Sequence, residues 1–148
     1  MRNEELLDQV GQLLDSQRFG VLATRYRNTP HQSLIAYILS ESLRDIFFVT
    51  PKYTRKVEAM ESDPRVALIV DNRQNLERDF DSCIAVTAKG IVEELPQHPR
   101  PPFLSRYLKK HPCLEEFATS PSCCYYRIRV QSYNLVRGFQ RVEELILD

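Results

Sequence analysis

Apolar residues recur at helical spacing near the start of the chain. In the segment 3–16 they stand at intervals of three and four residues, and acidic residues stand at its beginning. The apolar residues are Leu6, Leu7, Val10, Leu13 and Leu14. Residues at this spacing share one face of a helix. We therefore predict a surface helix that buries a single stripe.

Short runs rich in β-branched and aromatic residues follow at 19–24, 31–39 and 45–50. Polar connections separate them, and the first connection carries the turn-forming residues Asn28 and Pro30. Runs of this length joined by short polar links are typical of antiparallel strands in a meander.

A helix is predicted next, within 51–62, because helix formers dominate there and Val57 and Met60 share a face. Pro64 ends it, since the residue before a proline is pushed out of the helical region. Further strands are predicted at 65–70, at 82–95 with a break near Gly90, and at 124–136.

The segments between these strands have a different character. Residues 71–81 are charged and loop-like, and 96–102 hold four prolines in seven residues, which predicts irregular structure. Helical spacing returns from Phe103 to about Phe117, and the pattern assigns no element to 138–148.

Six short strands with a few helices do not alternate in the manner of a parallel α/β sheet. The pattern predicts a mainly β (α+β) fold, a six-stranded antiparallel barrel with flanking helices that cap its ends. The length of 148 residues suits one domain spanning 1–148.

Composition narrows the possible partners. The chain carries 20 basic and 20 acidic residues, so it has no overall field to attract nucleic acid, and any anion site must be local. Its longest apolar runs, such as 66–70, are too short to cross a bilayer, and its start lacks the apolar core of a signal peptide. We expect a cytoplasmic protein with reduced cysteines and, without C-x-x-C spacing, no metal site.

The most informative segment is Thr50-Pro51-Lys52-Tyr53-Thr54-Arg55-Lys56, where a strand ends and a helix begins. Thr54 suits the N-cap, and Arg55 and Lys56 fall in the first helical turn. Two cations at the positive end of a helix dipole oppose that dipole unless an anion is bound there. Phosphate fits this combination of hydroxyl, guanidinium, ammonium and backbone N–H groups. The alternative is a solvated basic turn.

This order of strand, threonine, turn and Thr-Arg-Lys resembles the FMN-phosphate segment of the pyridoxamine 5'-phosphate oxidase-like FMN-binding split-barrel family. The likeness continues in the first hairpin, in Asp63-Pro64-Arg65-Val66-Ala67 and in the strand with mid-strand Gly90. The resemblance implies that Thr54, Arg55 and Lys56 hold the phosphate and that Thr50 lies beside the ribityl chain or flavin. It implies that the flavin ring runs along the second strand, at Ser33, Leu34, Ile35 and Ala36.

The resemblance also implies a homodimer with flavin at the subunit interface, in which Arg137 reaches the partner's flavin. The apolar residues of the second to fourth strands exceed what a small barrel can enclose, which fits a contact larger than ~1,200–2,000 Å². The tail 134–141 lacks the arginine–histidine pair that the true oxidases use to hold pyridoxal phosphate, which argues against vitamin B6 oxidation.

The function implied is an FMN-dependent oxidoreductase acting on an unidentified small molecule, with NAD(P)H or oxygen as second partner. No catalytic residue is predicted, because the flavin carries the redox step. The alternative is a non-catalytic flavin- or haem-binding module for storage, sensing or transfer. Among other polar residues, His98 and His111 are expected at the surface, and Asn72 and Arg73 in a solvated turn. The alternative for Asn72 or Arg73 is a contact with the flavin or a substrate from the barrel rim.

Overall fold

The computed structural model describes residues 2–147. Its strands are β1 (Phe19–Tyr26), β2 (Thr29–Leu39), β3 (Asp45–Pro51), β4 (Arg65–Asp71), β5 (Ile84–Leu95), β6 (Cys123–Arg137) and β7 (Arg141–Ile146). Its helices are α1 (Arg2–Ser16), α2 (Arg55–Ser62), α3 (Asp79–Ser82), α4 (Leu104–Lys110), the 3-10 turn η1 (Pro112–Leu114) and α5 (Glu115–Ala118). None of the described helices is long and apolar enough to span a membrane.

The first six strands close into an antiparallel barrel. They are joined in the order β3-β2-β1-β4-β5-β6, and a further pairing of β3 with β6 closes the ring. This confirms the predicted six-stranded barrel with flanking helices. Two elements were not predicted: β7 pairs with the outer edge of β6, in the tail that had no assigned element, and the short α3 lies in the segment expected to be a loop.

Side chains fill the barrel interior. Tyr37, Phe48, Leu22 and Ile128 are among those with almost no exposed surface. Helix α1 adds its own stripe to this core through residues such as Leu14, whose carbonyl accepts a hydrogen bond of 2.7 Å from the Tyr37 hydroxyl. A cofactor of flavin size must therefore lie outside the barrel.

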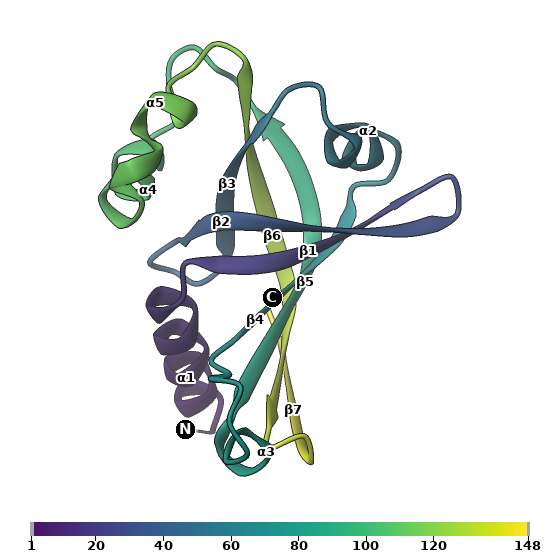
Figure 1. Cartoon of the computed structure of the whole chain (residues 1–148), viewed down its shortest axis with the longest axis vertical. Coiled ribbons are helices and arrows are strands. Elements are labelled where there is room, and N and C mark those ends of the chain that lie inside the picture. The colour runs from purple at the N-terminus through teal and green to yellow at the C-terminus, as the bar shows by residue number, and fades with distance from the viewer. Residues whose placement is uncertain (1, 148) are drawn as a thin grey trace.

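A second apolar cluster lies on the outer surface, where α4, η1 and α5 cover parts of β2, β3 and β6. Phe103 stacks on Phe47 with ring centroids 4.7 Å apart and meets Tyr125 edge-on at 5.9 Å. Cys123 belongs to this cluster, whereas the adjacent Cys124 points into the barrel core, as expected for neighbours on a strand. Figure 1 shows α4 and α5 on one side of the barrel and α2 on the other.

The barrel is split between β2 and β3. Only Tyr37–Leu39 of β2 pair with β3, so over residues 29–36 this edge of β2 has no strand partner among the described residues. The β1–β2 hairpin therefore projects from the barrel, as Figure 1 shows, and turns at Arg27 and Asn28, which both have positive φ. Residues 29–36 of β2 therefore form a free edge that borders the split.

The break predicted near Gly90 is a β-bulge. The register between β5 and β6 shifts between Lys89 and Gly90. A Cβ atom at position 90 would lie 2.2 Å from the carbonyl oxygen of Arg129, so only glycine permits this close approach of the two strands.

Candidate phosphate site at the start of helix α2

Thr54 is the N-cap of α2, as predicted. Its backbone is extended, and its hydroxyl oxygen accepts a hydrogen bond from the Val57 N–H at 3.3 Å. Glu58 N–H reaches the Thr54 carbonyl at 3.2 Å. The N–H groups of Arg55 and Lys56 precede these and have no acceptor within the helix, so they remain available to a ligand.

Lys56 extends back toward the end of β3. Its ammonium donates a hydrogen bond of 3.0 Å to the hydroxyl of the buried Thr50. Burial lowers the pKa of Lys56, because the partly desolvated ammonium has only a neutral acceptor here. An anion placed beside this group would favour its charged form.

Arg55 is the next cation along and is exposed to solvent. Within residues 2–147, neither Arg55 nor Lys56 has a carboxylate oxygen within 4.0 Å. The helix start thus presents two positive charges without a negative partner, together with the positive end of the dipole.

Strand β3, which leads into α2, diverges from β2 along the split. Tyr37 pairs with Phe48, so two residues further along the diverging strands Thr50 stands at the level of Ile35. Leu34 points outward and is 65% exposed, while the Ile35 side chain lies in the core. By this register, the predicted residues Ser33–Ala36 and Thr50 lie on the two strands that border the split, while α2 itself packs against β1.

Helix α4 and its C-cap residue cover one end of the free edge of β2. The Tyr107 hydroxyl donates to the Ala36 carbonyl at 3.3 Å, and the buried His111 ring shares a hydrogen bond of 2.8 Å with the Tyr37 carbonyl. The backbone that α4 leaves open is that of Ser33–Ile35. The sequence prediction that His111 is a surface residue was wrong: it is 4% exposed, and burial lowers its pKa.

Arg137 lies apart from this group within one chain. Thr50 is opposite Cys124 near the start of β6, whereas Arg137 is the last residue of that 15-residue strand. There its guanidinium donates to the Gln9 side chain at 2.6 Å. Any contact between Arg137 and a flavin bound at α2 must therefore come from a second copy of the chain.

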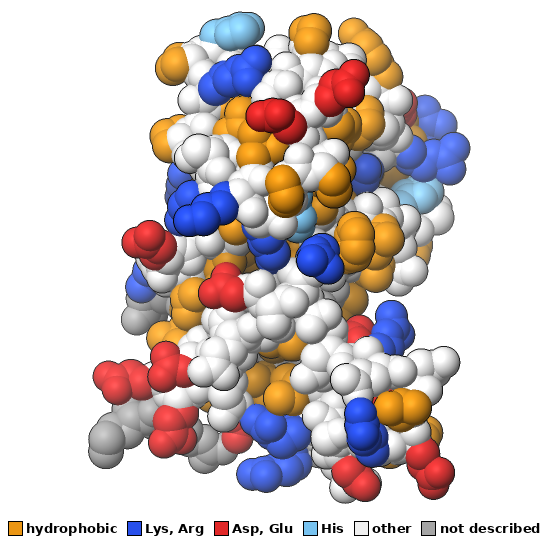
Figure 2. Space-filling model, turned by 60° about the vertical axis from the view of Figure 1, so that its left-hand side comes forward, with side chains coloured by type: hydrophobic (Ala, Val, Ile, Leu, Met, Phe, Trp, Pro, Cys, Tyr) orange, Lys and Arg blue, Asp and Glu red, His pale blue; other side chains and the backbone are white. Residues whose placement is uncertain are grey.

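Other polar candidates have structural roles. The Asn72 side chain accepts from the Ile84 N–H at 2.8 Å, and Arg73 pairs with Asp71 at 3.2 Å at the surface. In the part of the chain described, no three His, Cys, Asp or Glu side chains are grouped to hold a metal ion. Basic and acidic side chains are interspersed on the face drawn in Figure 2, which fits the balanced composition.

An apolar row crosses the outer surface of the barrel. Leu34 of β2, Val21 of β1 and Ile69 of β4 lie directly opposite one another in register and point outward. Leu34 and Ile69 are 65% and 41% exposed, and the nearby Phe19 is 57% exposed. Large exposed apolar side chains arranged in this way are typical of a surface that meets another molecule.

Solved structures share this fold at low identity. A haem-binding protein from Mycobacterium smegmatis aligns with a TM-score of 0.75 and 18% identity over 90% of this chain and 55% of its own. An FAD-binding protein from Mesorhizobium loti aligns with a TM-score of 0.67 and 21% identity over 88% of this chain and 90% of its own. General stress protein 26 from Bacillus anthracis gives a TM-score of 0.71 and 16% identity over 97% and 99% of the two chains.

A search of curated proteins finds no match. The family model described as pyridoxamine 5'-phosphate oxidase matches residues 6–137, a span that includes the whole barrel and the start of α2. The chain belongs to the pyridoxamine 5'-phosphate oxidase family.

Proposed function

We propose that this protein is an FMN-binding flavoprotein that holds the FMN phosphate at the start of α2. The observation that carries the proposal is the pair of cations, Arg55 and Lys56, which have no carboxylate partner among the described residues and stand in the first turn of a capped helix that follows β3. The family and the FAD-binding structural relative support a flavin, and the single phosphate cradle favours FMN.

The residues present fit such a group. Arg55, Lys56, the Thr54 hydroxyl and the first-turn N–H groups would hold the phosphate. Thr50 would lie beside the ribityl chain, and Ser33–Ile35 would offer backbone groups to the polar edge of the ring. A bound flavin would supply the redox chemistry, while the protein supplies binding, orientation and electrostatics.

We propose that two copies of the chain complete each site. Because side chains fill the barrel, the flavin ring would lie against its outer surface. The partner would cover the apolar row of Leu34, Val21 and Ile69. In this arrangement Arg137 of one copy would face the flavin of the other. A two-fold dimer with two equivalent sites follows from these shared contacts.

The activity proposed is oxidoreduction of an unidentified small molecule, with NAD(P)H or oxygen as the second partner. A non-catalytic flavin or haem carrier is the second candidate, because one structural relative is a haem-binding protein. The structure gives haem less support than flavin, since the buried His111 already shares its Nε2 with a backbone carbonyl.

The absorption spectrum of the purified chain separates these candidates. We expect flavin bands after loading with FMN, and bleaching of those bands when NADH or NADPH is added if the protein is an oxidoreductase. A Soret band after haemin loading, with no retention of FMN on gel filtration, would contradict the flavin proposal.

A further inference from the structure

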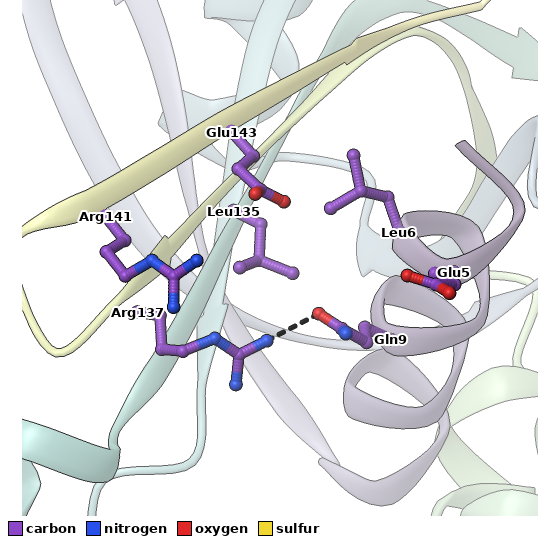
Figure 3. A pocket seen from close by; sticks show the side chains of 7 residues that line it. All are labelled: Glu5, Leu6, Gln9, Leu135, Arg137, Arg141 and Glu143. Atoms are coloured by element: carbon purple, nitrogen blue, oxygen red, sulfur yellow. Dashed lines mark hydrogen bonds between the residues drawn. The ribbon is translucent and has the colours of Figure 1, made fainter. Parts of the chain in front are cut away.

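A cavity of about 760 Å³ lies between α1 and the β6–β7 hairpin, away from the start of α2. Figure 3 shows side chains from both walls directed into it. Leu6 of α1 and Leu135 of β6 are buried and give it an apolar floor, while the remaining lining is polar. Its volume falls within the ~300–1,000 Å³ of small-molecule pockets.

Two arginines face one another at the mouth of this cavity. Arg137 and Arg141 are directly opposite in the register of β6 and β7, and both line the cavity. Like charges directly opposite on neighbouring strands are destabilising. Among the described residues neither guanidinium has a carboxylate within 4.0 Å to offset this repulsion, and Arg137 is fixed by the neutral Gln9.

An anionic group between the two guanidiniums would relieve the repulsion. Planar guanidiniums bind a carboxylate or phosphate through paired hydrogen bonds. Acidic residues in the same cavity restrict the choice. Glu5 lines it from α1, on the wall opposite the arginines, and Glu143, which already has an interaction partner, lines it from β7. A ligand with only negative charge would meet these carboxylates.

We propose that this cavity binds a small zwitterion whose two charges stand at opposite ends of a short apolar chain. Its carboxylate lies between Arg137 and Arg141, its methylene groups pack on Leu6 and Leu135, and its ammonium lies near Glu5. The residues that line the site all come from one chain. One of them, Arg137, is also the residue proposed above to face the partner's flavin in a dimer, so the two proposals share this guanidinium.

Three ligands of similar length test this site by isothermal titration calorimetry on the full chain: 5-aminopentanoate, pentanoate and pentylamine. We expect 5-aminopentanoate to bind at least about tenfold more tightly than either compound that lacks one charge, because each charged end makes charge-assisted hydrogen bonds. Equal affinity for 5-aminopentanoate and pentanoate would overturn the zwitterion assignment, and no binding of any of the three would overturn the site.

Two substitutions of exposed residues test where the carboxylate and the ammonium of the ligand bind. Arg141→Gln should weaken 5-aminopentanoate about tenfold or more, and Glu5→Gln should remove its advantage over pentanoate. Arg129→Gln changes an exposed residue on the neighbouring strand β6, and Glu4→Gln changes an exposed residue on the same helix, α1. Neither residue lines the cavity, and both variants should bind like the unchanged protein. Loss of binding in these controls, or normal binding in Arg141→Gln, would contradict the proposal.

Discussion

At the scale of single residues, the two cations at the start of α2 differ in their surroundings. Arg55 is exposed, whereas Lys56 is half-buried and bonded to Thr50. An exposed guanidinium adapts to a ligand at little cost, but a desolvated ammonium gains more from an anion, because the anion replaces the lost water. Lys56 is therefore expected to matter to both the phosphate and the local packing of Thr50.

Burial also sets how individual side chains respond to alkali. Burial raises the pKa of the Cys124 thiol from 9.0 to about 11, and it raises the pKa of Tyr37, Tyr107, Tyr126 and Tyr133. These groups keep their protons in the folded state at a pH where the unfolded chain releases them. Stability is thus lost as pH rises from about 9 through 11. Lys110, with its pKa lowered to about 8 by burial, acts in the opposite direction.

We predict that Cys124→Ala loses less stability between pH 8 and 10.5 than the unchanged protein, by on the order of 1 kcal/mol. The loss of stability that remains in Cys124→Ala comes from the buried tyrosines. Urea unfolding in the presence of reductant at several pH values measures it, and identical pH dependence in the two proteins would show that the thiol is not responsible.

Some residue roles were accessible from sequence and others were not. The N-cap role of Thr54 is local, since it depends on a strand end and a helix start that the pattern already marks. The burial of His111 depends on how α4 packs against β2, 74 positions away along the chain, and no local pattern records that contact. The link between Arg137 and Gln9 joins opposite ends of the chain and is invisible for the same reason.

At the scale of elements, hydrophobic periodicity predicted the barrel strands because each buries one face, which leaves alternation in the sequence. Strand β7 pairs on only one side and carries exposed Val142 and Ile146 with acidic residues between them. Its sequence pattern therefore resembles that of an irregular tail. The closing contact of β3 with β6 is a long-range pairing that was inferred from the fold class.

The cap of α2 connects an element to the site. Thr54→Ala removes the acceptor for the Val57 N–H, and we predict a loss of ~1 kcal/mol in the free energy of unfolding together with weaker FMN binding. Thr54→Ser keeps the hydroxyl and should retain most of both. Thermal unfolding and FMN titration of the two variants check this, and equal behaviour of Ala and Ser would exclude a capping role.

At the scale of the whole molecule, the apolar row on the outer barrel surface should govern assembly. We predict that Ile69→Lys weakens dimerisation about tenfold or more, because it places a charge in a contact that excludes water. Ile146→Lys changes an isoleucine that is 69% exposed on β7, outside the row, and should leave the proposed dimer intact. Sedimentation velocity at micromolar concentration distinguishes them, and a monomeric unchanged protein that still holds FMN would refute the shared site.

Equilibrium titration of FMN and riboflavin against the unchanged chain, Arg55→Ala and Lys56→Ala tests whether α2 holds the phosphate of FMN. Riboflavin lacks the phosphate and serves as the matched control. Each substitution removes a charge-assisted contact of about 1.5–3 kcal/mol, so FMN should bind ten- to a hundredfold more weakly while riboflavin binding stays nearly constant. Equal losses for the two ligands, or no loss for FMN, would contradict the assignment.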